Sequence, residues 1–86
     1  MTLLVLGISH HSAPLDVLDA LALDAERADL LRRSAAERDF VNSAVVLSTC
    51  NRLEIIADVT SFHGGLADLG TALVDVSGLP WSELFS

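Results

Sequence analysis

Residues 43–59 read SAVVLSTCNRLEIIADV, and this stretch decides the fold. Two aliphatic runs, at 43–48 and 53–59, lie on either side of the connection Thr49-Cys50-Asn51-Arg52. Short apolar runs around a short polar connection predict two strands that pair as an antiparallel hairpin. Cys50 is the only cysteine of the chain. In such a hairpin it lies in the turn at the rim of a sheet, where a substrate can reach its thiol.

Further elements are expected before the hairpin. Residues 2–9 form a short aliphatic run that predicts a buried strand. A first helix is expected after the N-cap residue Ser12, and a second from the cap Asp24 to about Glu37. Leu30 and Leu31 of the second helix are both expected to pack into the core.

A third helix is expected after the hairpin. It should begin at Thr60 or Ser61 and stop at Gly78, with a short helical turn at 81–85. Alternating four- and three-residue spacing gives it an apolar stripe that is expected to face the core. The stripe consists of Phe62, Leu66, Leu69, Leu73 and Val76. The resulting order, β-α-α-β-β-α, predicts an α+β fold: an incomplete ferredoxin-like unit that lacks its last strand.

The composition of the chain argues against disordered, nucleic-acid-coating, secreted and membrane-spanning proteins. The chain has 86 residues, is 51% hydrophobic and carries a formal charge of −7, with arginine as its only basic residue besides histidine. This composition excludes a disordered chain and argues against a nonspecific phosphate-binding surface. A single cysteine excludes an internal disulfide and fits a reducing compartment. No secretion signal or membrane-spanning run is visible, so the expected location is the cytoplasm and no membrane partner is expected.

The connection carries groups suited to nucleophilic chemistry. The guanidinium of Arg52 near Cys50 would favour the thiolate, which is the nucleophilic form, and could hold a substrate carboxylate with two hydrogen bonds. Structural alternatives remain for each residue. A lone cysteine is often simply buried, and Arg52 has Glu54 as a competing ion-pair partner on the same strand face. Glu54 itself is either structural or serves to position Arg52.

The histidines do not indicate a metal site. His10 and His11 are adjacent, so on an extended segment they point to opposite sides and make poor joint ligands. His63 is distant in the sequence and is expected at the surface. No metal-ligand spacing is present, and we expect no metal. One of the two adjacent histidines could line a pocket beside Ser12, and a capping or packing role is the alternative.

Two motifs resemble those of a known family. Residues 48–55, Ser-Thr-Cys-Asn-Arg-Leu-Glu-Ile, resemble the nucleophile motif of the glutamyl-tRNA reductases. Residues 7–15, Gly-Ile-Ser-His-His-Ser-Ala-Pro-Leu, resemble the first signature of the same family. The likeness runs from about residue 4 to residue 57. It identifies residues 1–86 as the N-terminal part of the catalytic domain, with the NADPH-binding and dimerisation domains absent.

The resemblance implies an activity. Cys50 would attack glutamyl-tRNA to form a thioester, and NADPH would reduce the thioester to glutamate-1-semialdehyde, the first step of tetrapyrrole (heme) biosynthesis. Thr49, Asn51 and Arg52 match residues that line the glutamyl pocket. The full-length protein is expected to be a homodimer. The five glycines form no dinucleotide fingerprint, so these residues hold no cofactor site and the fragment alone should not complete the reduction.

The chain departs from the usual family pattern at three positions, and these departures are tolerable variations that could alter the pocket wall. Family members usually carry an aromatic residue at position 56, a basic residue at 11 and often an arginine at 18, where this chain has Ile56, His11 and Leu18. Two other functions stand beside the reductase hypothesis. One is a noncatalytic binding or regulatory module that has retained the fold. The other is an α+β interaction domain in which Cys50 is inert.

Overall fold

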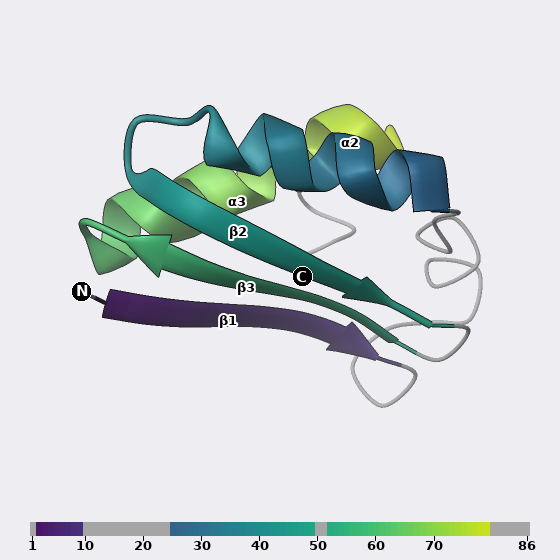
Figure 1. The fold of residues 1–86 in the computed structure, drawn as a ribbon, viewed down its shortest axis with the longest axis horizontal. Coiled ribbons are helices and arrows are strands. Elements are labelled where there is room, and N and C mark those ends of the chain that lie inside the picture. The colour runs from purple at the N-terminus through teal and green to yellow at the C-terminus, as the bar shows by residue number, and fades with distance from the viewer. Residues whose placement is uncertain (1, 10–24, 50–51, 80–86) are drawn as a thin grey trace.

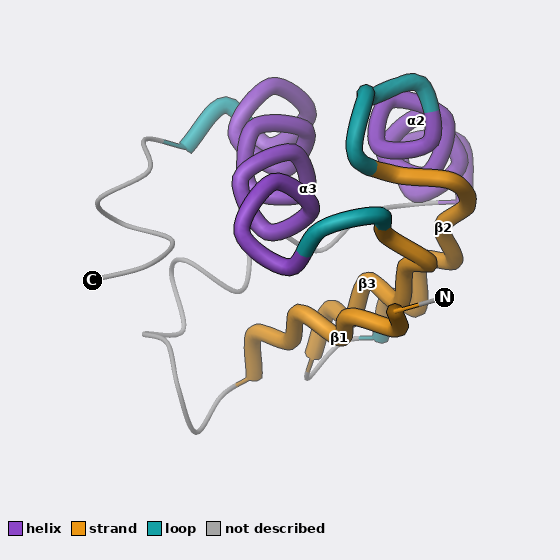
Figure 2. The backbone as a smooth tube through the Cα atoms, turned by 90° about the vertical axis from the view of Figure 1, so that its left-hand side faces the viewer, coloured by secondary structure: helices purple, strands orange, loops and turns teal. Residues whose placement is uncertain are grey.

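The computed structural model describes residues 2–9, 25–49 and 52–79. Three strands form one antiparallel sheet in the order β1-β3-β2, and two helices pack on the same face of it (Figures 1 and 2). The elements are β1 (Thr2–Ser9), α2 (Ala25–Ala36), β2 (Val41–Ser48), β3 (Arg52–Val59) and α3 (Phe62–Ser77). The predicted α+β class is therefore confirmed.

The predicted strands agree closely with the structure. The first strand has the expected bounds, whereas β2 begins two residues earlier than expected, at Val41, beyond an irregularity in its register between Val41 and Ser43. The central strand β3 pairs with both neighbours. The helix expected after Ser12, the cap Asp24 and the turn expected at 81–85 lie outside the described residues. The ferredoxin-like assignment therefore stays a prediction.

The core lies between the sheet and the two helices. Side chains alternate along β3, so that Leu53, Ile55, Ala57 and Val59 are buried while the residues between them are not. The largest fully buried side chains are Leu31, Ile55, Val59, Leu69 and Leu73. These side chains come from α2, β3 and α3, so each helix contributes to one continuous core. No charged or polar residue of the described part of the chain is buried in it.

Helix α3 begins and ends where the sequence predicts. The side chain of Ser61 caps its start by accepting a hydrogen bond from the Gly64 N–H at 3.3 Å. Gly78 ends it in the left-handed region, with φ of 74°, and donates its N–H to the Val74 carbonyl at 2.9 Å. A residue with a side chain is strained at that φ, so glycine is the natural stop.

Two of the side chains predicted to pack into the core, Phe62 and Leu30, are instead exposed. Phe62 is exposed, because the first turn of α3 presents Gly65 to the sheet instead. Leu30 is also exposed, with 48% of its surface accessible, whereas its neighbour Leu31 is fully buried. Adjacent residues on a helix point about 100° apart, so a single buried face admits only one of the pair. The rest of the α3 stripe is confirmed: Leu69, Leu73 and Val76 are buried and Leu66 is partly buried.

The glycine pair in the first turn of α3 allows the helix to lie close to the sheet. A Cβ atom added at Gly65 would lie only 2.5 Å from Cγ1 of Val59, inside the core. A Cβ atom at Gly64 would lie 2.5 Å from Cγ of the Phe40 ring, and Phe40 is 44% exposed. The two glycines weaken the helix locally, but Gly65 is required by close packing against β3.

We therefore expect Gly65→Ala to lower the free energy of unfolding by about 1–3 kcal/mol, because Val59 cannot move without disturbing the core. The matched control Gly64→Ala should change it by less than about 1 kcal/mol, because the Phe40 ring can rotate into solvent and alanine favours the helix. Denaturant unfolding of both variants measures the difference. A Gly65→Ala chain as stable as the parent would contradict the close approach.

Candidate functional site

The connection between β2 and β3 is closed by backbone hydrogen bonding. The Thr49 N–H donates to the Arg52 carbonyl at 2.9 Å, and the Thr49 hydroxyl lies 3.4 Å from the same oxygen. Only Cys50 and Asn51 lie between these two residues in the sequence, and both are outside the described residues. The structure thus places Thr49 and Arg52 side by side at the ends of the paired strands, while the position of the thiol stays a prediction.

Arg52 and Glu54 lie on the sheet face that the helices do not cover. The residue between them, Leu53, is buried beneath the helices, so alternation directs its two neighbours to the opposite side. Nη2 of Arg52 lies 2.9 Å from Oε1 of Glu54, and their side chains are 55% and 26% exposed. The ion pair considered as the structural alternative is therefore present. A pair this exposed contributes about 0–1 kcal/mol to stability, so the fold gains little from it.

The ion pair leaves Arg52 able to bind a ligand. A guanidinium carries five N–H donors, and the hydrogen bond to Glu54 uses Nη2 alone. The partner also favours one orientation of this long side chain on the sheet face. An oriented, half-exposed guanidinium is a suitable group for a carboxylate, since it can donate two parallel hydrogen bonds to it.

Strand β1 brings the second sequence motif to the same end of the sheet. Ser9 is the register partner of Arg52, and Gly7 is the partner of Glu54. Because Gly7 has no side chain, a Cβ atom placed there would make ordinary contact with Cγ of Glu54 at 3.7 Å. The described start of the first motif, residues 7–9, therefore lies beside residues 52–54 of the second motif. His10 and His11 follow Ser9 directly but lie outside the described residues.

The proximity of Gly7 and Ser9 to Glu54 and Arg52 was not predicted from the sequence. Apart from the hairpin, no strand pairing was predicted, so these residues were not expected to lie side by side. Pairing between β1 and β3 joins residues more than 40 positions apart, and local patterns carry no information about it. The only usable signal was that the two family-like motifs both occur at strand ends.

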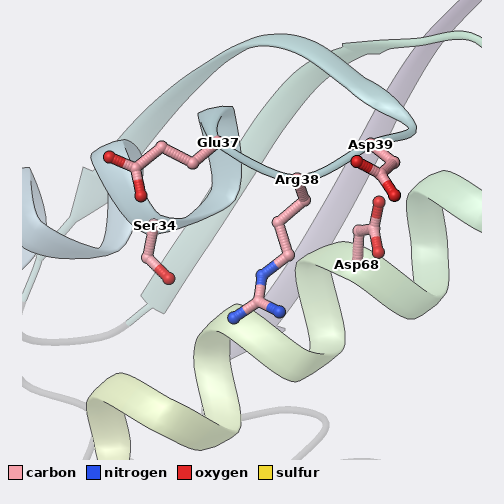
Figure 3. A pocket seen from close by; sticks show the side chains of 5 residues that line it. All are labelled: Ser34, Glu37, Arg38, Asp39 and Asp68. Carbon is pink, nitrogen blue, oxygen red and sulfur yellow. The ribbon is translucent and has the colours of Figure 1, made fainter.

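A hollow of about 360 Å³ lies at the other end of the sheet, between the loop that leads into β2 and helix α3 (Figure 3). It is lined by Ser34, Glu37, Arg38, Asp39 and Asp68. Two of these residues connect the loop to α3: Arg38 pairs with Asp75 at 2.8 Å, and Asp68 accepts the Phe40 N–H at 2.9 Å. Since β2 starts at this hollow and ends at Ser48, the hollow is remote from the Cys50 connection. We assign it a structural role.

Within residues 2–9, 25–49 and 52–79, no cluster of three or more histidine, cysteine or acidic side chains is arranged for a metal ion. In the same part of the chain, neither helix is long and apolar enough to cross a membrane. His63 is exposed, as expected, and its ring contacts that of Phe62 edge to face.

Comparison with known proteins identifies the family. Residues 6–86 match the family described as "Glutamyl-tRNAGlu reductase, N-terminal domain". Proteins named glutamyl-tRNA reductase from Kineococcus radiotolerans, Streptomyces coelicolor and Frankia casuarinae are 45%, 44% and 43% identical to this chain over 84 residues. Each match covers 98% of this chain but only 19%, 14% and 18%, respectively, of the relative, so the chain spans less than a fifth of their length. The chain belongs to the glutamyl-tRNA reductase family and matches its N-terminal domain.

Proposed function

We propose that this chain carries the acyl-accepting site of a glutamyl-tRNA reductase, in which the Cys50 thiol receives the glutamyl group from glutamyl-tRNA. The observation that supports this most is the position of Arg52. Its side chain is half exposed and pairs with Glu54, and Arg52 lies two residues beyond Cys50 in the sequence and beside Ser9, within the other family motif. The names of the relatives supply the substrate, since those proteins are reductases of glutamyl-tRNA.

The proposed step is an acyl transfer. The Cys50 thiolate attacks the ester carbonyl carbon that joins glutamate to tRNA, and a C–S bond replaces the C–O bond. The tRNA hydroxyl leaves and takes up a proton. Backbone N–H groups of the turn are candidates to stabilise the oxyanion that forms during the attack. The product is a thioester, a form that accepts hydride more readily than a carboxylic acid.

The substrate carboxylate determines the role proposed for Arg52. The α-carboxyl group of the glutamyl group is esterified, so its only free carboxylate is on the side chain. Arg52 would hold this carboxylate with two N–H donors, and Glu54 would keep the guanidinium in place. Thr49 and Asn51 would line the same pocket. A matching distance between the carboxylate and the reacting carbon would select glutamate over shorter acids.

The complete reaction requires more than these residues. The overall product would be glutamate-1-semialdehyde for tetrapyrrole synthesis, with NADPH as the source of hydride. The glycines of this chain, at positions 7, 64, 65, 70 and 78, form no dinucleotide fingerprint and do not fit that cofactor. We propose that other domains of a full-length, homodimeric and cytoplasmic reductase bind the cofactor and most of the tRNA. Here the acidic chain would contact only the acceptor end.

Incubation with glutamyl-tRNA should transfer glutamate to Cys50, because an activated ester needs only a positioned thiolate. Intact-mass spectrometry measures the adduct, and Cys50→Ser is the control that should stay unmodified. The test uses both the 86-residue chain and a full-length reductase carrying residues 1–86 as its N-terminal region. Absence of adduct on a folded full-length protein would reject the proposal and favour a noncatalytic binding module. Adduct on the full-length protein alone would show that downstream residues are needed.

Arg52→Lys should slow adduct formation by about tenfold or more, because lysine keeps the charge but loses the paired donors that fit a carboxylate. The loss should appear as weaker substrate binding, since the reacting thiol is untouched. The control reaction is alkylation of Cys50 by a small neutral reagent, which needs no carboxylate site. An unchanged transfer rate would show that Arg52 does not hold the substrate.

Glu54→Gln separates a positioning role from a structural one. We expect it to change the free energy of unfolding by less than about 1 kcal/mol, because the ion pair is exposed. It should nevertheless slow glutamyl transfer in the parent and have little further effect in the Arg52→Lys background, since it acts through Arg52. A large loss of stability with an unchanged transfer rate would instead mark Glu54 as purely structural.

A further inference from the structure

One face of the sheet carries a band of exposed apolar side chains. Helices α2 and α3 both lie on the other face (Figure 2), and no described element packs on this one. We call it the open face, and its apolar members are Leu3, Val5, Val45, Leu47 and Ile56. Four of them, Leu3, Val5, Val45 and Leu47, are 65%, 60%, 53% and 49% exposed.

These residues form a continuous band because of strand register. Val5 of β1 and Val45 of β2 are both partners of Ile56 in β3, so one apolar row crosses all three strands. The solvated face of an antiparallel sheet normally carries polar residues at these positions. A band of contiguous apolar side chains is typical of a surface that another element covers.

An unsatisfied acceptor lies on the same face. Oδ1 of Asp58 is buried and, among the described residues, has no hydrogen-bond partner. Asp58 lies between Leu3 and Ser43, its partners on the two neighbouring strands. A buried polar atom without a partner costs about 1–3 kcal/mol. The open face therefore combines apolar area with one position that requires a donor.

We propose that the open face is an internal docking surface of a full-length reductase. Its occupant is an apolar segment of the downstream chain that sets an N–H group or a basic side chain opposite Asp58. The inference rests on the proposed function only in taking this chain as part of such a reductase. Between 81% and 86% of each compared relative lies outside the match, so those proteins hold ample chain to cover the face.

Charge and position favour this occupant over others. With a net charge of −7 and the carboxylate of Asp58 on the face, a nucleic acid or a second acidic copy is a poor match. A segment docked along the Val5–Ile56–Val45 row would also approach the next row, where Gly7 and Leu47 flank Glu54. It would then shield Arg52 from water on one side, which strengthens its hold on a carboxylate.

Cysteine labelling tests whether the face is covered. In a Cys50→Ser background, Val45→Cys reports on the open face, and Leu30→Cys on α2 is the matched control with similar exposure. The maleimide reaction is compared between the 86-residue chain and the full-length reductase. We expect Val45→Cys to react about 100-fold more slowly in the full-length protein, because its site must open first. Leu30→Cys should change by less than about threefold.

Each other outcome overturns the proposal. Equal reaction of Val45→Cys in both proteins would show that no downstream segment covers the face. Slow reaction within the 86-residue chain would place a second copy there if it depends on concentration, and another part of these 86 residues if it does not. Glutamyl transfer is measured separately on chains that retain Cys50, so failure of either idea is recognised independently.

Asp58→Asn gives a second readout for the donor. It removes the charge that the docked segment would meet, so we expect a lower melting temperature in the full-length protein. In the 86-residue chain it should leave the melting temperature unchanged or raise it, because no segment covers the face and the substitution removes a carboxylate whose Oδ1 atom is buried without a partner. If the substitution changes the melting temperature of both proteins by the same amount and in the same direction, no downstream donor lies opposite Asp58.

Discussion

The alternation of side chains along β3 is the constraint on which the rest of the structure depends. As the central strand, β3 is hydrogen-bonded on both sides, so its register is fixed twice. Its odd-numbered residues from Leu53 to Val59 are buried in the core, on the sheet face that carries both helices. Its even-numbered residues must therefore lie on the opposite face of the sheet, because side chains alternate along a strand. These residues are Arg52, Glu54, Ile56 and Asp58.

The two faces of β3 thus have different roles, one in stability and the other in the candidate site. Apolar burial against α2 and α3 supplies most of the folding free energy, and it requires nothing from the opposite face. The opposite face is therefore free to carry an oriented arginine at one end and an apolar row in the middle. A shift of one residue in register would bury Arg52 and expose Ile55, so the core itself holds the candidate site in place.

Local signals made much of this fold predictable. The hairpin followed from two apolar runs around a short connection, and the ends of α3 followed from Ser61 and Gly78, since caps act within a few residues. What could not be predicted is set by contacts distant in sequence. These include the order of strands, the close approach of Gly65 to Val59, and the outward direction of Leu30 and Phe62.

The candidate site was predictable to a similar degree. The motif around Cys50 predicts a nucleophile at that position and a carboxylate-binding role for Arg52, and the structure adds the Glu54 ion pair and the neighbourhood of Gly7 and Ser9. Which face Arg52 takes follows from burial of Leu53, which a motif alone does not state. The thiol itself and the histidines after Ser9 lie outside the described residues, so their roles rest on sequence and family.

The pH dependence of Cys50 alkylation in the folded chain tests the central claim most directly. The claim is that the β2–β3 connection presents a thiol to solvent beside the guanidinium of Arg52. It predicts rapid alkylation without unfolding, with a thiol pKa below the ordinary value of about 8.5 that rises toward it in Arg52→Gln. A thiol that reacts only when the chain unfolds, or a pKa that is ordinary and indifferent to Arg52, would contradict the account.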